Sequence, residues 1–265
     1  MPEPRVVEAF ARLVDIMARL RGPGGCPWDL EQTPESLRPY LLEEAYEVLD
    51  AIDRGEPTAL RDELGDLLLQ VVFQSQLAAE AGRFTVADVA TAIADKLVRR
   101  HPHVFGDVQV RDARDVMRNW TRIKAEERRA AGTDGLFAGV PAALPALARA
   151  QELGEKARHA GLDWPDLAGV LDKVREEQGE LEAAVASGDR RAIEHELGDL
   201  LLAIASVARH LEMSAELALR AASARFVTRA ERVDEAARTA GRRLADLSPA
   251  EVDRLWAQVK GEPDA

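Results

Sequence analysis

Two identical stretches of sequence, Glu63-Leu64-Gly65-Asp66-Leu67-Leu68 and Glu196-Leu197-Gly198-Asp199-Leu200-Leu201, stand 133 positions apart. Each follows a second acidic cluster, which reads Glu43-Glu44-Ala45-Tyr46-Glu47 in the first half and Glu176-Glu177-Gln178-Gly179-Glu180 in the second. The last Glu of each cluster lies 16 residues before the Glu that opens the repeated stretch. Matches in the same order at one offset indicate that the chain contains a duplicated module.

Tryptophans flank the acidic pattern in both halves and support the same duplication. Trp28 and Trp164 precede the clusters with an offset of 136, and Trp120 and Trp256 follow them with the same offset. Between the halves, Gly and Pro gather from 132 to 145, and these residues interrupt helices. We therefore expect module one at 1–131, a linker at 132–145 and module two at 146–265.

The composition favours an all-α fold. Apolar residues make up 46% of the chain and aromatic residues only 5%, and no segment alternates in the manner of a strand. Breakers such as Gly55, Gly82 and Gly188 bound the expected helices, and Thr85 suits an N-cap. We expect tandem helical-bundle modules, or half-bundles completed by a partner. The expected helices span about 34–53, 58–81, 85–100, 166–186, 190–212 and 214–240, with Pro34 near the start of the first.

The repeated acids point to a shared cation. Residues three and four apart lie on one face of a helix, so the two acidic segments of each module bring their carboxylates together if the helices are antiparallel neighbours. The alternative is that these acids are ordinary solvated surface residues. However, Asp66 and Asp199 lie among leucines, and crowded like charges destabilise a helix. Because this repulsive arrangement of carboxylates occurs in both modules, we expect a cation to compensate the negative charge.

The chemistry of the expected ligands narrows the choice of cation and of reaction. Carboxylate oxygens suit Mg²⁺, Mn²⁺ or Ca²⁺, and the Glu-x-x-Asp pattern, rather than Glu-x-x-His, favours Mg²⁺. Such a site suits phosphate chemistry, with a spare carboxylate, Glu43 or Glu176, as general base. Basic residues are then expected to hold the phosphates. The four tryptophans are candidates for stacking on a base, and the alternative, favoured for at least two of them, is that they fill the core. The candidates for substrate binding are Lys96, Arg99, Arg100, Trp120, Lys124, Arg225, Arg229, Trp256 and Lys260.

Several classes of protein are disfavoured. A formal net charge of −12 argues against a nucleic-acid binder, and no uncharged run is long enough to cross a bilayer. The single cysteine, Cys26, rules out an intrachain disulfide and fits a cytoplasmic protein, and charges near the N-terminus exclude a signal peptide. The sequence has neither a P-loop nor a Gly-x-Ser-x-Gly elbow.

Four stretches together resemble the MazG-type all-α nucleoside triphosphate pyrophosphohydrolases: Gly25 to Asp29, Leu42 to Val48, Glu63 to Leu68 and Lys96 to Phe105. The resemblance implies Mg²⁺-dependent hydrolysis of NTPs or dNTPs between the α and β phosphates, giving a nucleoside monophosphate and pyrophosphate. It also implies broad base tolerance, a homodimer and a role in clearing unwanted nucleotides. By motif match the metal ligands are Glu44, Glu47, Glu63 and Asp66 in module one and Glu177, Glu180, Glu196 and Asp199 in module two.

Module two departs from this pattern. Where the family has a run like Lys-Phe-x-x-Arg-Arg, this chain has Arg225-Phe226-Val227-Thr228-Arg229, and Arg does not always replace Lys at a phosphate. The sequence therefore leaves open which module is active. A competing hypothesis is a helical regulatory or scaffold protein that binds nucleotides or a partner without turnover.

Overall fold

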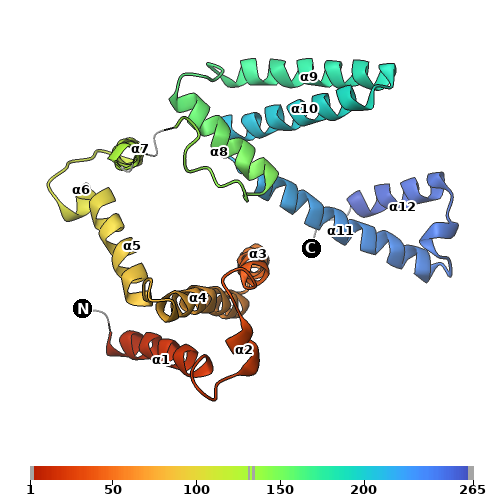
Figure 1. Ribbon diagram of the computed structural model, residues 1–265. Helices are drawn as coiled ribbons and strands as arrows, with labels where there is room; N and C mark the ends of the chain where they lie inside the picture. The colour runs from red at the N-terminus through yellow and green to blue at the C-terminus, as the bar shows by residue number, and fades with distance from the viewer. Residues whose placement is uncertain (1–2, 131, 133–134, 262–265) are drawn as a thin grey trace. The chain divides into compact units, whose positions relative to one another are not determined.

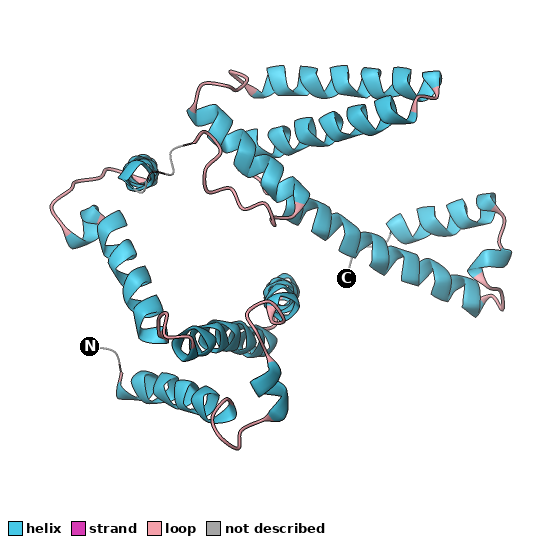
Figure 2. Ribbon diagram, viewed as in Figure 1, coloured by secondary structure: helices cyan, strands magenta, loops and turns pink. Residues whose placement is uncertain are grey.

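The computed structural model describes residues 3–130, 132 and 135–261, apart from the side chain of Arg128. The expected module boundary at 131 and part of the expected linker, 133–134, lie outside the described residues. Two compact units divide the chain, Met1–Glu126 and Glu127–Ala265, which we call the N-terminal and C-terminal units. In the described part the regular structure is entirely helical, which confirms the all-α prediction (Figure 2).

The helices follow one another without a sheet anywhere among the described residues (Figure 1). They are α1 (Pro4–Leu20), α2 (Pro27–Glu31), α3 (Arg38–Arg54), α4 (Pro57–Glu80), α5 (Val86–Arg100), α6 (Pro102–Phe105), α7 (Ala113–Ala130), α8 (Ala146–His159), α9 (Leu167–Ser187), α10 (Arg190–His210), α11 (Ala215–Thr239), the 3₁₀ turn η1 (Leu244–Asp246) and α12 (Pro249–Gly261).

In the N-terminal unit, α4 packs between α1 and α3 (Figure 1). A core cluster forms where α1 and the segment before α3 meet α4, and it includes Met17, Leu37 and Phe73. Gly55 ends α3 in the left-handed conformation, with φ 66°, and lets the chain reverse into α4. The α3–α4 pair is therefore a tight helical hairpin, and this hairpin carries the acidic clusters of module one.

The C-terminal unit repeats the hairpin with α9 and α10 (Figure 1). Gly188, with φ 73°, ends α9, and the Asp189 side chain caps α10 by accepting hydrogen bonds from two backbone N–H groups. Small buried residues, among them Ala184 and Ala203, allow close packing. Helix α8 packs against α10, while the long α11 runs away from the hairpin and α12 folds back along it.

The six predicted helices correspond to α3, α4, α5, α9, α10 and α11, and their bounds agree to within a few residues except at the start of α3. We expected Pro34 near the start of a helix, whereas residues 34–37 form a turn and α3 begins at Arg38. Thr33 and Ser36 hydrogen-bond to each other across this turn, which places Leu37 in the core at 1% exposure. Thr85 does cap α5, through a capping box with Asp88, as predicted.

Candidate metal centre

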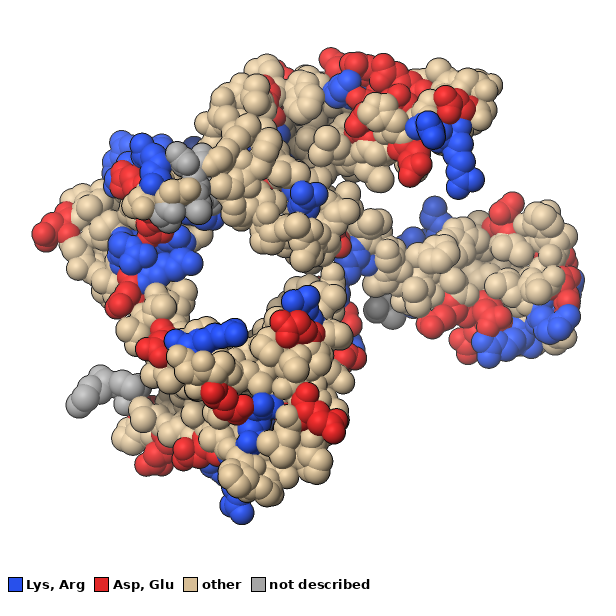
Figure 3. Space-filling view, viewed as in Figure 1, with Lys and Arg blue, Asp and Glu red and all other residues tan. Residues whose placement is uncertain are grey.

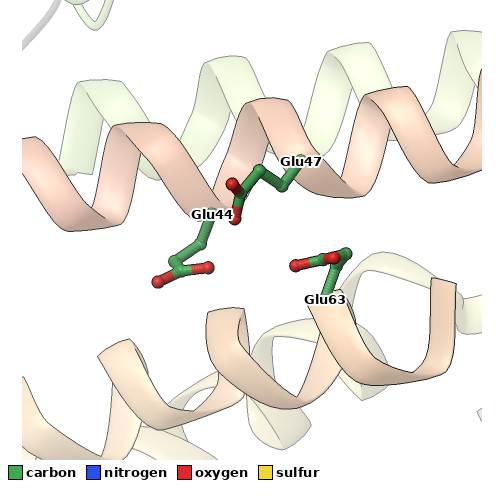
Figure 4. A group of neighbouring side chains, drawn as sticks. All are labelled: Glu44, Glu47 and Glu63. Atoms are coloured by element: carbon green, nitrogen blue, oxygen red, sulfur yellow. The ribbon is translucent and has the colours of Figure 1, made fainter. Parts of the chain in front are cut away.

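The acids of the N-terminal unit meet across the α3–α4 hairpin. Figure 4 shows Glu44 and Glu47 projecting from one helix toward Glu63 on the facing helix. One carboxylate oxygen from each of the three lies within 4.8 Å of the others. Glu44 and Glu63 are half-buried and Glu47 is exposed. Antiparallel helices with an i, i+3 pair on one of them account for this convergence.

Burial and nearby carboxylates raise the pKa of Glu44 and the pKa of Glu63. Burial raises the pKa of Glu44, and the nearby charges of Asp66, Glu47 and Glu43 raise it further. Burial and repulsion from Glu47 and Asp66 raise the pKa of Glu63 in the same way. Asp66 lies outside the tight group of three oxygens, yet its charge acts on two members. The cluster therefore carries an excess of negative charge that a cation would neutralise.

The C-terminal unit gathers its acids around Glu177, which belongs to two groups at the same 4.8 Å limit. One group joins it to Glu196 and Asp199 on α10, and the other joins it to Glu176 and Glu180 on α9. Glu177 is 4% exposed, and its Oε2 atom has no hydrogen-bond partner among the described residues. Acidic side chains crowd this hairpin in Figure 3. A buried carboxylate oxygen without a partner is costly, which points to a ligand there.

Lys173 is a site residue that the sequence analysis missed. Its Nζ atom lies 2.7 Å from Glu176 Oε1 and 2.5 Å from Glu177 Oε1, and these contacts raise the pKa of the lysine. The sequence contained the information needed to predict this contact, because a lysine three and four residues before two glutamates lies on their face of the helix. The matching position in module one is Tyr40, so the two sites differ in charge.

The predicted substrate-binding residues lie on α5, α7, α11 and α12, whereas the acids lie on α3, α4, α9 and α10. Arg100 Cζ and Lys124 Nζ each lie 5.4 Å from the centre of the Trp120 ring. Figure 1 shows α5, which also carries Lys96 and Arg99, running away from the α3–α4 hairpin. Likewise Arg225 and Arg229 lie on α11 and Lys260 on α12, which extend away from α9 and α10.

The prediction that at least two tryptophans fill the core is wrong. Trp28 is 48% exposed and Trp164 is 38% exposed. Trp120 and Trp256 are half-buried, and Trp256 contacts Phe226 with ring centres 5.6 Å apart. The core is built instead from aliphatic side chains, alanines and Phe73.

In both units, carboxylates from two facing helices come together. The protein is therefore of an all-helical class with candidate sites for a divalent cation. Comparison with known proteins identifies the family to which the chain is similar. The family model described as MazG nucleotide pyrophosphohydrolase domain matches residues 32–105 and 168–236, and each match contains one acidic hairpin. The chain belongs to this family, and the two matches confirm the duplication.

Relatives align over almost the full chain. The nucleoside triphosphate pyrophosphohydrolase of Escherichia coli strain K12 is 46% identical over 94% of this chain and 96% of its own length. The nucleoside triphosphate pyrophosphohydrolase/pyrophosphatase MazG of Thermotoga maritima is 42% identical over 95% of this chain and 96% of its own length. No described helix has both the length and the apolar character needed to cross a membrane.

Proposed function

We propose that this protein hydrolyses nucleoside and deoxynucleoside triphosphates between the α and β phosphates, releasing a nucleoside monophosphate and pyrophosphate. Broad base tolerance and the clearing of unwanted nucleotides from the cytoplasmic pool belong to the same proposal. The convergence of Glu44, Glu47 and Glu63 across the α3–α4 hairpin is the observation that carries it. The printed activities of the relatives from E. coli and T. maritima, at 46% and 42% identity, support it.

The acidic clusters fit Mg²⁺, with Mn²⁺ as a substitute. Their donors are carboxylate oxygens, burial and then neighbouring carboxylates raise the pKa values of Glu44 and Glu63, and Glu177 Oε2 has no partner among the described residues. When bound, the cation supplies positive charge to the phosphate oxygens and makes a neighbouring water more acidic. The proposed ligands are Glu44, Glu47, Glu63 and Asp66 in one unit and Glu177, Glu180, Glu196 and Asp199 in the other.

The remaining side chains are proposed to act as general bases or to bind the substrate. Glu43, which is exposed beside the cluster, and Glu176 are proposed as general bases that accept a proton from the attacking water. In the C-terminal unit the ammonium of Lys173 holds Glu176 in place. The phosphates are proposed to bind to Lys96, Arg99, Arg100, Lys124, Arg225, Arg229 and Lys260, with Trp120 and Trp256 beside them.

A second copy of the chain is proposed to complete each site. Leu64, Leu68 and Val71 on α4 are 39% to 48% exposed, and α10 exposes Leu197 and Leu201 in the same way. Contiguous exposed apolar side chains mark an interface, and a two-helix hairpin needs further helices to make a bundle. A homodimer would bury these faces and bring the basic residues of one chain to the acids of the other.

Single-unit variants test the proposal. Glu44→Gln removes one predicted ligand from the N-terminal unit, Glu177→Gln removes one from the C-terminal unit, and Glu8→Gln, on the exposed surface of α1, is the matched control. Turnover of each NTP is followed by ³¹P NMR, which separates pyrophosphate from phosphate. We expect Mg²⁺-dependent pyrophosphate release that falls in at least one ligand variant and is lost in the double variant. Nucleotide binding without any release would instead support a scaffold role.

A further inference from the structure

Trp28 is an exposed tryptophan on a rigid support. Its side chain is 48% exposed, although an indole of this size normally gains from burial. Arg21, whose side chain is only 7% exposed, donates hydrogen bonds to the carbonyl oxygens of Asp29 and Gln32 and forms an ion pair with Glu80. Gln32 Nε2 in turn donates to the Trp28 carbonyl oxygen at 2.9 Å. A buried arginine thus holds the end of the short helix α2 in place, while the Trp28 ring on that helix stays in solvent.

The ring that Trp28 meets belongs to the acidic helix. Trp28 and Tyr40 lie edge to face, with ring centres 5.7 Å apart and planes at 81°. Tyr40 stands three and four residues before Glu43 and Glu44 on α3, so these side chains share one face of the helix. The Tyr40 side chain is also exposed, at 37%. The Tyr40 ring therefore lies about one helical turn from Glu44 on α3, and the Trp28 ring lies beside it.

We propose that Trp28 and Tyr40 form the nucleobase subsite of the N-terminal unit, an inference that rests on the proposed function. With the phosphates near Glu44 and Glu63, the base of the same nucleotide extends to this pair and stacks on the indole, while Tyr40 sets the ring's angle. Aromatic stacking accepts any base because every base has a π face. The subsite therefore binds purine and pyrimidine triphosphates alike.

Module two lacks this pair. Lys173 takes the place of Tyr40, and Trp164 has no aromatic partner among the described residues. Trp164 lies instead beside Gly169, near the start of α9 and more than two turns from Glu177. The two units therefore bind the base differently, and Trp164 serves as the matched control for Trp28.

Fluorine NMR of the full chain labelled with 5-fluorotryptophan tests the subsite directly. Four resonances are assigned with single Trp→Phe variants. The probes are α,β-methylene-ATP, which carries a base and resists cleavage at this bond, and tripolyphosphate, which has the phosphates alone, each with Mg²⁺. We expect the methylene analogue to shift the Trp28 resonance and tripolyphosphate to leave it in place. A Trp28 resonance that both probes move equally, or that neither moves, would overturn the subsite.

Kinetics separate this inference from the proposed function. In the Glu177→Gln background, which isolates the N-terminal site, Trp28→Leu and Tyr40→Leu are expected to raise KM for NTPs about tenfold, equivalent to about 1.4 kcal/mol, with a smaller change in kcat. Tyr40→Phe, which keeps the ring, should restore KM, and Trp164→Leu should leave the N-terminal site unaffected when measured in the Glu177→Gln background. Pyrophosphate release with an unchanged KM in both Leu variants refutes the subsite alone. Absence of pyrophosphate release from the wild-type chain refutes the proposed function, and the subsite with it.

Discussion

Replacing Glu44 with Gln is expected to stabilise the metal-free protein and to reduce the stabilisation that Mg²⁺ gives to the N-terminal unit. Glu44 faces three like charges, on Glu43, Glu47 and Asp66. Each like-charge contact of this kind costs about 0.2–0.5 kcal/mol, so the neutral amide should add about 1 kcal/mol to the free energy of unfolding. For a unit of this size, that gain raises Tm by roughly 3–5 °C.

With Mg²⁺ bound, we expect the wild-type protein to be more stable than Glu44→Gln. At about 100 times its Kd, a ligand specific to the folded state contributes about 2.7 kcal/mol, so Mg²⁺ should raise the wild-type Tm by roughly 8–12 °C. Glu44→Gln removes a proposed ligand and should lose most of the part of that gain that comes from the N-terminal site. The opposite signs of the two effects distinguish a metal ligand from a residue that merely supports the fold.

The pH dependence follows from the raised pKa of Glu44. The folded metal-free protein holds this proton more tightly than the unfolded chain, so its stability falls as the pH rises from the ordinary value of 4.5 through the raised pKa. Below 4.5, where the carboxyl is protonated in both states, Glu44→Gln should confer no advantage. Thermal unfolding by circular dichroism, with EDTA or Mg²⁺ at acidic and neutral pH, measures all these effects, and Glu8→Gln is the control. A variant that is less stable without Mg²⁺ and still fully stabilised by it would refute the reasoning.

Three further predictions concern the supporting structure. Arg209→Met leaves Asp163, whose side chain is 9% exposed, without its bidentate partner and should lower the free energy of unfolding by about 3–5 kcal/mol in urea titrations. A loss below about 1 kcal/mol would mean that the pair is solvated. Thr85→Ala should cost about 1 kcal/mol by removing the capping box, whereas Thr85→Ser should retain most of it. Hydrogen bonds from Ser248 hold the pKa of Glu251 at about 2, so stability present above 4.5 should be lost as the pH falls toward 2. Glu251→Gln should flatten that part of the pH profile, and an unchanged profile would contradict the contact.

Much of this fold was readable from the sequence because local signals and the duplication agree. Gly55 and Gly188 stop helices at equivalent places, and the paired acidic stretches fix which helices must be neighbours. The Pro34 prediction failed because a proline also suits a turn, and burial of Leu37 decided between the two. Tertiary packing, rather than local propensity, set that boundary.

The candidate site was predicted less completely than the fold. Helical spacing predicted the convergence of Glu44, Glu47 and Glu63, but it gave no measure of how far Asp66 lies from them. The contacts of Lys173 with Glu176 and Glu177 follow the same helical spacing and were not predicted. The exposure of Trp28 was not predicted, because it follows from tertiary contacts, such as the hydrogen bond from Arg21 at the end of α1 to the Asp29 carbonyl oxygen on α2.

Binding of Mn²⁺ to the unliganded protein tests the central claim most directly. The electron paramagnetic resonance signal of free Mn²⁺ is titrated with the wild-type chain, with Glu44→Gln/Glu177→Gln and with the Glu8→Gln control. The wild-type chain and the control should deplete the free signal, and the double variant should leave most of it intact. Equal depletion by all three proteins would mean that the paired acidic helices do not hold the cation.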